Sequence, residues 1–196
     1  MIKIETIEKD IADAISHLHF MNRVLDSYKG LEDVFQNRPE LKKYFTTEIE
    51  NFHSIVTLAQ LEISLSLKAI YYAKCKSEKS HLIKRGLLVL YEIKMALDKL
   101  NPVFKKIKDD YPELENEFKE ITIIIKQAKR RIADEPRIMH IRNNISAHIN
   151  TNFLENYKYL ETVDLEEDID LIIRMKLILN ELNNFLLKVC INQLKK

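Results

Sequence analysis

Apolar side chains recur along this chain every three or four residues, over runs much longer than one helical turn. Between residues 2 and 28 the apolar series is Ile4, Ile7, Ile11, Ala14, Ile15, Leu18, Val24 and Leu25. This spacing follows the 3.6-residue turn of an α-helix and places the apolar side chains on one face. A strand would show strict alternation instead, and the sequence contains no alternating run of any length. The chain is therefore predicted to fold from amphipathic helices.

Few residues interrupt these helical runs, since the 196 residues include only 2 glycines and 4 prolines. Average proteins contain about 7% glycine and 5% proline. The predicted helices cover residues 2–28, a long run from Pro39 past Ile70, 79–99, a short piece at 103–109, 113–132, a helix from Pro136 that fades at 150–152, and 164–194. Asp164 is the expected N-cap of the last helix, with Glu167 completing an acidic capping box. We expect residues 1–196 to form one all-α domain, an up-and-down bundle of five to seven helices.

The overall charge and the cysteines exclude several classes of protein. The chain carries 31 basic and 30 acidic residues, a net charge of +1, so it lacks a global basic signature for nucleic acid. Cys75 and Cys190 are far apart and form no CxxC motif, so zinc and redox motifs are not supported and a reducing compartment is the default. The first ten residues, MIKIETIEKD, are charged from the third onward, unlike a signal peptide. No uncharged run reaches the roughly 20 apolar residues of a membrane span. We expect a soluble, cytoplasmic protein without a membrane partner.

A metal site is the first chemical possibility to weigh in a helical bundle. The Glu-x-x-His spacing of di-iron bundles occurs twice, at Glu50 with His53 and at Glu78 with His81. A di-iron site needs both pairs in the core at one level, but Glu78 and His81 lie in the polar stretch KCKSEKSHLIKR. His53 sits near an apolar helix face, where a hydrogen-bonded core or boundary histidine is the commoner role. We therefore predict no cofactor, and a metalloprotein through Glu50 and His53 is a minor alternative.

The stretch IRNNISAHIN, residues 141–150, is unusually polar for a helix of this chain. On a helical wheel Ile141, Ile145 and Ile149 fall within about 60° of Ile138 and form the expected buried stripe. A second, polar stripe beside it consists of Arg137, His140, Asn144 and His148. Arg142 lies about 120° from His148, so the two side chains cannot meet on one straight helix. They can converge if the helix is distorted or if two copies face each other across a two-fold axis.

Positive charge gathers around this stretch. From Lys126 to His148 there are six basic and two acidic residues, a local net charge of +4, and the segments on both sides are acidic. Such a concentration of positive charge can attract a phosphate backbone. The alternative is that these side chains only solvate helix faces, which is the commoner role of any single surface charge.

An arginine, then a polar residue that is often asparagine, then a histidine after four to six intervening residues resembles the motif of the HEPN superfamily. Here the match is Arg142-Asn143, then NISA, then His148. The resemblance implies a helical bundle that cleaves RNA without a metal at a homodimer interface, often within a defence or toxin–antitoxin system. It implies Arg142 and His148 as catalytic residues, with supporting or RNA-binding roles for Asn143, Asn144, His140 and Arg137. An antitoxin or another operon partner would be a further ligand.

The chemistry suits these residue types. Cleavage by the neighbouring 2′-OH needs a general acid or base near neutral pH, which His148 can be. It also needs a fixed positive charge that stabilises the negative charge of the transition state, which the planar guanidinium of Arg142 can supply. The chain departs from a minimal plan in its long last helix and in the extra His140 and Asn144. A non-catalytic helical protein-interaction module is therefore the alternative.

Overall fold

The structure, a computed structural model, describes residues 3–30, 36–37, 47–134, 136, 138–139 and 163–193. Within these ranges the elements with defined bounds are all helical: α1 (Ile4–Lys29), α3 (Thr47–Tyr72), α4 (Lys76–Lys99), α5 (Asn101–Asp110), the 3-10 helix η2 (Pro112–Leu114), α6 (Glu115–Ala133) and α9 (Leu165–Gln193). The expected all-α bundle of five to seven helices is confirmed. None of the described helices is both long enough and apolar enough to span a membrane.

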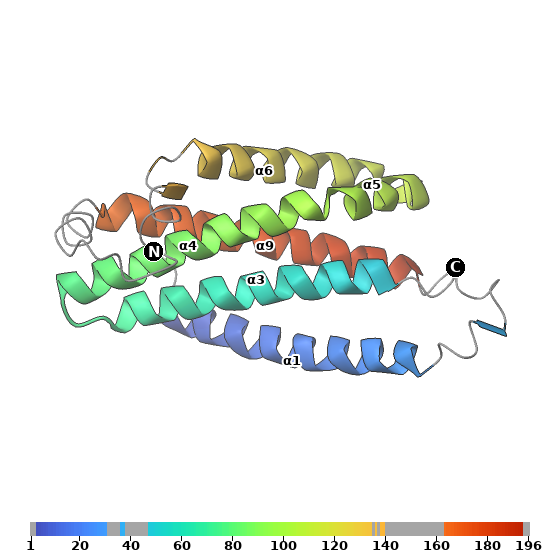
Figure 1. Cartoon of the computed structure of the whole chain (residues 1–196), viewed down its shortest axis with the longest axis horizontal. Coiled ribbons are helices and arrows are strands. Elements are labelled where there is room, and N and C mark those ends of the chain that lie inside the picture. The colour runs from blue at the N-terminus through green and yellow to red at the C-terminus, as the bar shows by residue number, and fades with distance from the viewer. Residues whose placement is uncertain are drawn as a thin grey trace.

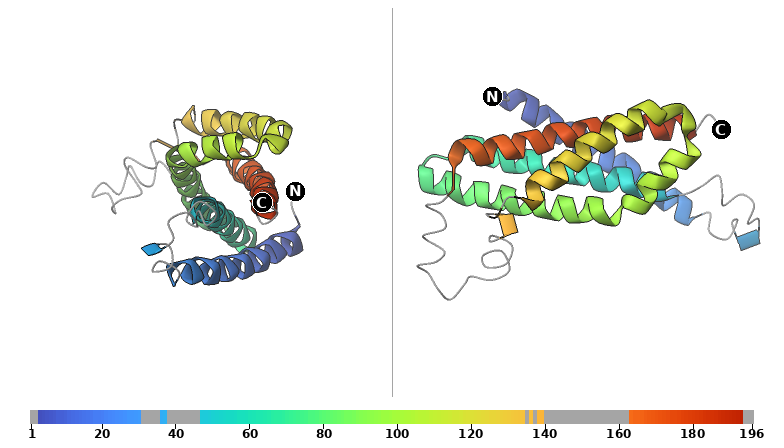
Figure 2. Two further views of the ribbon diagram at one scale, coloured as in Figure 1. Left: turned by 90° about the vertical axis from the view of Figure 1, so that its right-hand side faces the viewer. Right: turned by 90° about the horizontal axis from the view of Figure 1, so that it is seen from above.

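Successive long helices run in alternating directions (Figure 1). The central helix α3 packs against α1, α4 and α9, and α9 also contacts α4 and α6. Seen end-on, α1 lies on one side of the α3, α4 and α9 group, and α5 and α6 lie on the other (Figure 2). The last turn of α6 and the first turn of α9 therefore lie at the same end of the bundle as the turn between α3 and α4.

The core lies where α3, α4 and α9 face one another. Its most deeply buried side chains, with no exposed surface, include Ile63, Leu87, Leu90, Ile172 and Leu179. Together they remove a continuous apolar stripe of each helix from water, which is the main stabilising contribution. At the end of the bundle near α5, the ring of Phe104 packs 4.6 Å from Phe118 and 6.0 Å from Phe185, centroid to centroid.

Most helix bounds fall within three residues of those predicted, and the differences have local causes. Helix α4 begins at Lys76 and not at 79, and the carboxylate of Glu78 accepts a hydrogen bond of 2.7 Å from the Lys74 backbone N–H just before the helix. The short piece predicted at 103–109 is a true helix, α5, with Pro102 in its first turn, where its missing N–H costs nothing. The start predicted at Pro39 lies outside the described residues.

The expected N-cap of α9 is present, with one change of partner. Asp164 Oδ1 accepts hydrogen bonds of 2.9 Å from the backbone N–H groups of Glu166 and Glu167. The Asp164 backbone N–H in turn donates a hydrogen bond of 3.0 Å to Asp168 Oδ2, so the acceptor is one residue beyond the expected Glu167. This reciprocal arrangement satisfies N–H groups that would otherwise lack a partner at the start of a helix.

Candidate functional site

The residues predicted from the Arg-Asn…His motif all lie outside the described residues: Arg137, His140, Arg142, Asn143, Asn144 and His148. The structure does describe where this part of the chain joins the bundle. Ile138, predicted to face the core, is fully buried, and Val163 on the far side of the segment is also buried in the core. Ile138 and Val163, which flank residues 140–162 in the sequence, thus both belong to the bundle core.

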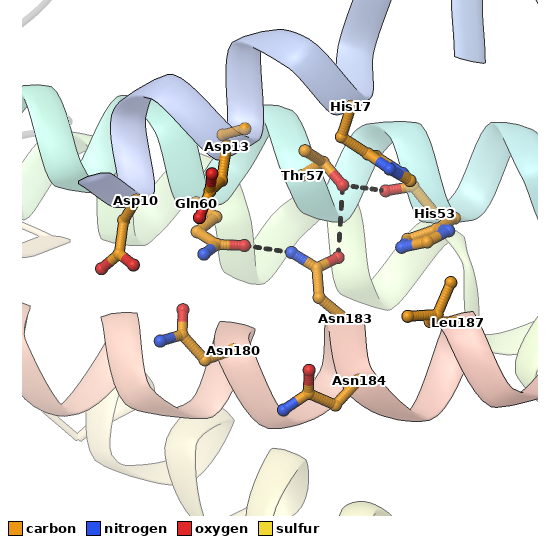
Figure 3. A pocket seen from close by; sticks show the side chains of 11 residues that line it. Asp10, Asp13, His17, His53, Thr57, Gln60, Asn180, Asn183, Asn184 and Leu187 are labelled. Atoms are coloured by element: carbon orange, nitrogen blue, oxygen red, sulfur yellow. Dashed lines mark hydrogen bonds between the residues drawn. The ribbon is translucent and has the colours of Figure 1, made fainter. Parts of the chain in front are cut away.

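Elsewhere in the described part of the chain, a polar pocket of about 290 Å³ opens between α1, α3 and α9 (Figure 3). We call it the three-helix pocket. Its lining residues are Asp10, Asp13, Ala14, His17, His53, Thr57, Gln60, Asn180, Asn183, Asn184 and Leu187. Each helix contributes polar residues at intervals of three or four, along the border between its buried stripe and its solvent face. The pocket forms where three such borders meet.

One side of the three-helix pocket is held by a hydrogen-bonded network between α3 and α9. The Thr57 hydroxyl lies 3.0 Å from the His53 carbonyl oxygen and 3.3 Å from Asn183 Oδ1, so it can donate to either. The amide nitrogen of Asn183 donates to Gln60 Oε1 (Figure 3). Asn183 is thereby fixed in one orientation, because its two amide ends have different partners.

Two polar atoms of the pocket are buried and make no hydrogen bond with any described residue. They are His17 Nε2 on α1 and Asn180 Oδ1 on α9. A buried polar atom without a partner costs free energy, which a bound molecule or water can recover by supplying the missing hydrogen bond. The two atoms are therefore the natural contact points for a ligand.

The histidines of this pocket are uncharged at neutral pH. The rings of His17 and His53 lie 4.3 Å apart, centroid to centroid, and are tilted by 51°. Burial, with a smaller contribution from His17, lowers the pKa of His53 to about 4, and burial also lowers the pKa of His17. Cys190 Sγ lies 3.9 Å from His53 Nδ1, and burial followed by the charge of Glu50 raises the pKa of that thiol to about 11. The two imidazoles that line the pocket are thus neutral, and the thiol beside His53 is protonated.

This electrostatic state favours binding over acid–base catalysis. A general acid or base works best with a pKa near the working pH, which His53 does not have. The lining residues include two aspartates and no lysine or arginine, although Asp10 forms an ion pair with Lys176, which does not line the pocket. The pocket therefore suits a small neutral or cationic molecule that donates hydrogen bonds, and it disfavours a phosphate.

The two Glu-x-x-His pairs do not come together. Glu50 and His53 lie in the first turns of α3, whereas Glu78 and His81 lie in the first turns of α4, at the opposite end of the bundle (Figure 1). Glu50 and His53 are buried, and the other pair is exposed. Within the described ranges, no group of three or more His, Cys, Asp or Glu side chains could hold a metal ion. Of the two roles expected for His53, a core or a boundary histidine, the structure shows the core role, with 4% of its surface exposed.

No protein-family model matches this chain, and no curated protein and no solved structure is significantly similar to it. The resemblance to the HEPN superfamily consequently depends on the motif and its helical context alone. The three-helix pocket was not predicted from the sequence. Its signal was present as polar residues at helical spacing, such as Asp13 with His17 and His53 with Thr57, but such pairs are common on helix borders.

Proposed function

We propose that this protein is a HEPN-like, metal-independent endoribonuclease, or an RNase-derived RNA-binding protein, that acts as a homodimer in a cytoplasmic defence or toxin–antitoxin system. The observation that carries the proposal is the sequence Arg142-Asn143…His148 within an all-α bundle. The burial of Ile138 and Val163 supports it, because these residues flank the motif in the sequence and both belong to the bundle core.

The charges on the second half of α6 also support an approach by RNA. Lys126, Arg130 and Arg131 there are exposed, and they precede the motif in the sequence. Exposed basic side chains next to a site raise the local concentration of a polyanion. The three-helix pocket is acidic and opens between other helices, so it does not compete for the phosphate backbone.

The proposed reaction is an internal transfer at phosphorus. The 2′-oxygen of one nucleotide forms a bond to the adjacent phosphorus while the bond to the 5′-oxygen of the next nucleotide breaks. One imidazole removes the 2′-hydroxyl proton or supplies a proton to the leaving 5′-oxygen, a role that His148 fits. Arg142 would neutralise the charge that develops on the phosphoryl oxygens. The products are a 2′,3′-cyclic phosphate and a 5′-hydroxyl end, with no water consumed in this step.

The experiment is an RNA cleavage assay on the purified full chain in the presence of EDTA. Single-stranded and tRNA-like RNA pools should be cut, and the new ends should be 2′,3′-cyclic phosphates. Arg142→Ala and His148→Ala should each lower the cleavage rate by at least about a hundredfold, the usual contribution of one acid–base or charge-stabilising group.

Matched controls exist on the opposite side of the molecule. His19→Ala and Arg23→Ala change exposed side chains of the same two types on α1, and they should leave cleavage unchanged. All variants are compared by circular dichroism to verify the helical fold. A wild-type protein that is inert toward broad RNA pools and does not bind them would rule out this proposal.

A non-catalytic protein-interaction module is the second candidate, and exposed apolar side chains favour it. Leu58, Leu65 and Tyr72 follow one another at seven-residue intervals on α3, with 49%, 43% and 56% of their surface exposed. A regular exposed apolar stripe is typical of a helix that binds another helix. Retention of a partner protein by the wild type, and its loss in a Leu58→Ser and Leu65→Ser double variant, would support this candidate.

A further inference from the structure

A groove runs between α6 and α9 on the side of the bundle away from α1. It consists of two adjoining cavities, of about 330 Å³ and about 120 Å³, and Ile124 of α6 lines both. We call this surface the α6–α9 groove. Its middle part is apolar: Leu177 is 51% exposed, and Ile124 and Ile178 are half-buried. Exposed apolar surface of this kind between charged ends is typical of an interaction site.

The two ends of the α6–α9 groove carry opposite charge. At the end next to the last turn of α6 the lining includes Arg131 and Arg174. At the other end it includes Glu117, Glu120 and Glu181. The ends differ because α6 and α9 run in opposite directions. Arg131 near the end of α6 therefore lines the groove with Arg174 in the first half of α9, and Glu117 and Glu120 near the start of α6 line it with Glu181.

Some of these charges already have partners within the chain, all of them at the surface. Asp170 lies 2.6 Å from Arg174 and 4.0 Å from Arg131, and Lys188 lies 3.7 Å from Glu117. When these partners are included, the first end has a net charge of +1, from Arg131, Arg174 and Asp170. Three glutamates against one lysine leave the other end negative by −2. The opposition between the ends therefore persists.

The charges are also spaced symmetrically about the middle of the groove. Glu117 and Arg131 each lie seven residues from Ile124, about 10 Å along the helix axis at 1.5 Å per residue. On α9, Arg174 and Glu181 are seven residues apart, so each lies about 5 Å along the axis from the midpoint between them. A surface with this pattern is complementary to itself when one copy is rotated by half a turn about an axis through its centre.

We infer that the α6–α9 groove is a docking surface for a second copy of this chain, arranged about a two-fold axis close to Ile124. Arg131 of each copy then faces Glu117 of the partner subunit, and Arg174 faces Glu181 of the partner subunit. The exposed apolar residues of both copies are removed from water between these pairs. Contacts of this isologous kind are the commonest in homo-oligomers.

This contact is distinct from the one invoked for the RNase motif. Because the two copies of α6 run antiparallel across the axis, their last turns, after which the motif follows in the sequence, lie at opposite ends of the pair. The proposal therefore adds a second interface and does not rest on RNA cleavage. A protein that uses both contacts forms a tetramer, and one that uses only the α6–α9 groove forms a dimer.

The test exchanges the charges at the two ends. One variant carries Arg131→Glu and Arg174→Glu, and the other carries Glu117→Lys and Glu181→Lys. Each variant alone opposes like charges across the axis, so each should lose half of the wild-type mass in light scattering at roughly 100 μM chain. An equimolar mixture of the two should regain the wild-type mass, because every pair then has opposite charges again.

Recovery of the wild-type mass in the mixture distinguishes this arrangement from a simple loss of solubility or folding in the variants. All four positions are on the surface, and circular dichroism checks that each variant keeps its helices. A monomeric wild type, variants of unchanged mass, or a mixture that fails to reassociate would each overturn the inference. Arg142→Ala and His148→Ala should keep the association through the α6–α9 groove, so the outcome is independent of the cleavage assay.

Discussion

The ring of His17 on α1 lies 4.3 Å from the ring of His53 on α3, and both histidines have a lowered pKa. The contact is therefore one between two neutral imidazoles. A proton on either ring would place a charge in a partly desolvated space and next to the other ring. This makes the packing of α1 on α3 sensitive to acid, because the two helices meet at this point.

We expect the protein to lose stability as the pH falls from about 6.5 to about 4. The pKa of His53 is about 4 in the folded chain, against 6.5 for an unperturbed histidine, so the unfolded chain takes up the proton first. The stability that depends on a neutral His53 is fully present above pH 6.5 and is lost between pH 6.5 and pH 4. The free energy of unfolding falls by roughly 3 kcal/mol in total over this range. Urea denaturation at several pH values between 7.5 and 4 measures this effect.

The matched variants for this experiment are His53→Gln and His19→Gln. His53→Gln removes the buried titrating group and should flatten the pH dependence, whereas His19 is exposed on the same helix as His17 and should leave it unchanged. Carboxylates also titrate in acid, so the quantity to compare between variants is the slope of the free energy of unfolding against pH, and not its absolute value. Equal slopes for wild type and His53→Gln would contradict the expectation.

The ion pair between Asp10 and Lys176 predicts an asymmetry between its two deletions. Lys176 is 1% exposed, whereas the side chain of Asp10 is 19% exposed and can be reached by water. Asp10→Ala leaves a buried ammonium without its partner and should lower the free energy of unfolding by roughly 3 kcal/mol. Lys176→Met leaves a carboxylate that water can solvate, and it replaces the stem with an apolar chain of similar length, so it should cost less.

Denaturant unfolding of both variants measures this difference at neutral pH. The control is the pair of Lys68 and Glu8, which joins the same helix α1 to α3 but has both side chains about 40% exposed (39% and 43%). Glu8→Ala should change the free energy of unfolding much less than Asp10→Ala does, because water solvates both members of this pair. A larger loss for Lys176→Met than for Asp10→Ala would show that the buried lysine does not depend on Asp10.

Gly86 permits a close approach of α4 and α9, and an alanine there should be destabilising. An added Cβ would lie 2.6 Å from Ile172 Cδ1, a side chain with no exposed surface. Alanine is favoured over glycine inside a helix by about 1 kcal/mol, but overpacking a full core costs about 1 to 3 kcal/mol. We expect Gly86→Ala to lower stability by about 1 kcal/mol.

A double-mutant cycle with Ile172→Val tests the cause. Ile172→Val removes the Cδ1 atom and should itself cost about 1 kcal/mol. If the clash is responsible, Gly86→Ala should become neutral or stabilising in the Ile172→Val background, with a coupling free energy of at least about 1 kcal/mol. Additive effects would show that the contact with Ile172 Cδ1 does not cause the effect of Gly86→Ala.

The two cysteines should differ sharply in their reaction with alkylating agents. Cys75 is exposed in the turn before α4, whereas burial raises the pKa of Cys190 to about 11. The thiolate is the reactive form, so at pH 8 Cys190 should stay unmodified until the protein unfolds. Mass spectrometry after iodoacetamide treatment, with and without denaturant, checks this. Modification of Cys190 in the native protein would indicate local opening of α9.

The secondary structure of this protein is largely local in origin. The apolar period predicted the long helices, and even the short helix α5, because a helix is formed by hydrogen bonds between residues four apart and its buried face repeats with the same period. The error at the start of α4 arises at Ser77 and Glu78, which lie outside the apolar period. The N-cap at Asp164 was predictable for the same local reason, since its partners are two to four residues away.

The sequence by itself therefore determined an all-α bundle, the approximate ends of its helices and the burial of residues such as Ile138. Only the tertiary structure decided which helix borders meet. His17 and His53, or Thr57 and Asn183, are brought together by the rotation and axial position of whole helices, and the same is true of the opposed ends of the α6–α9 groove. These contacts join residues from 36 to 126 positions apart, and no period within one helix contains that information.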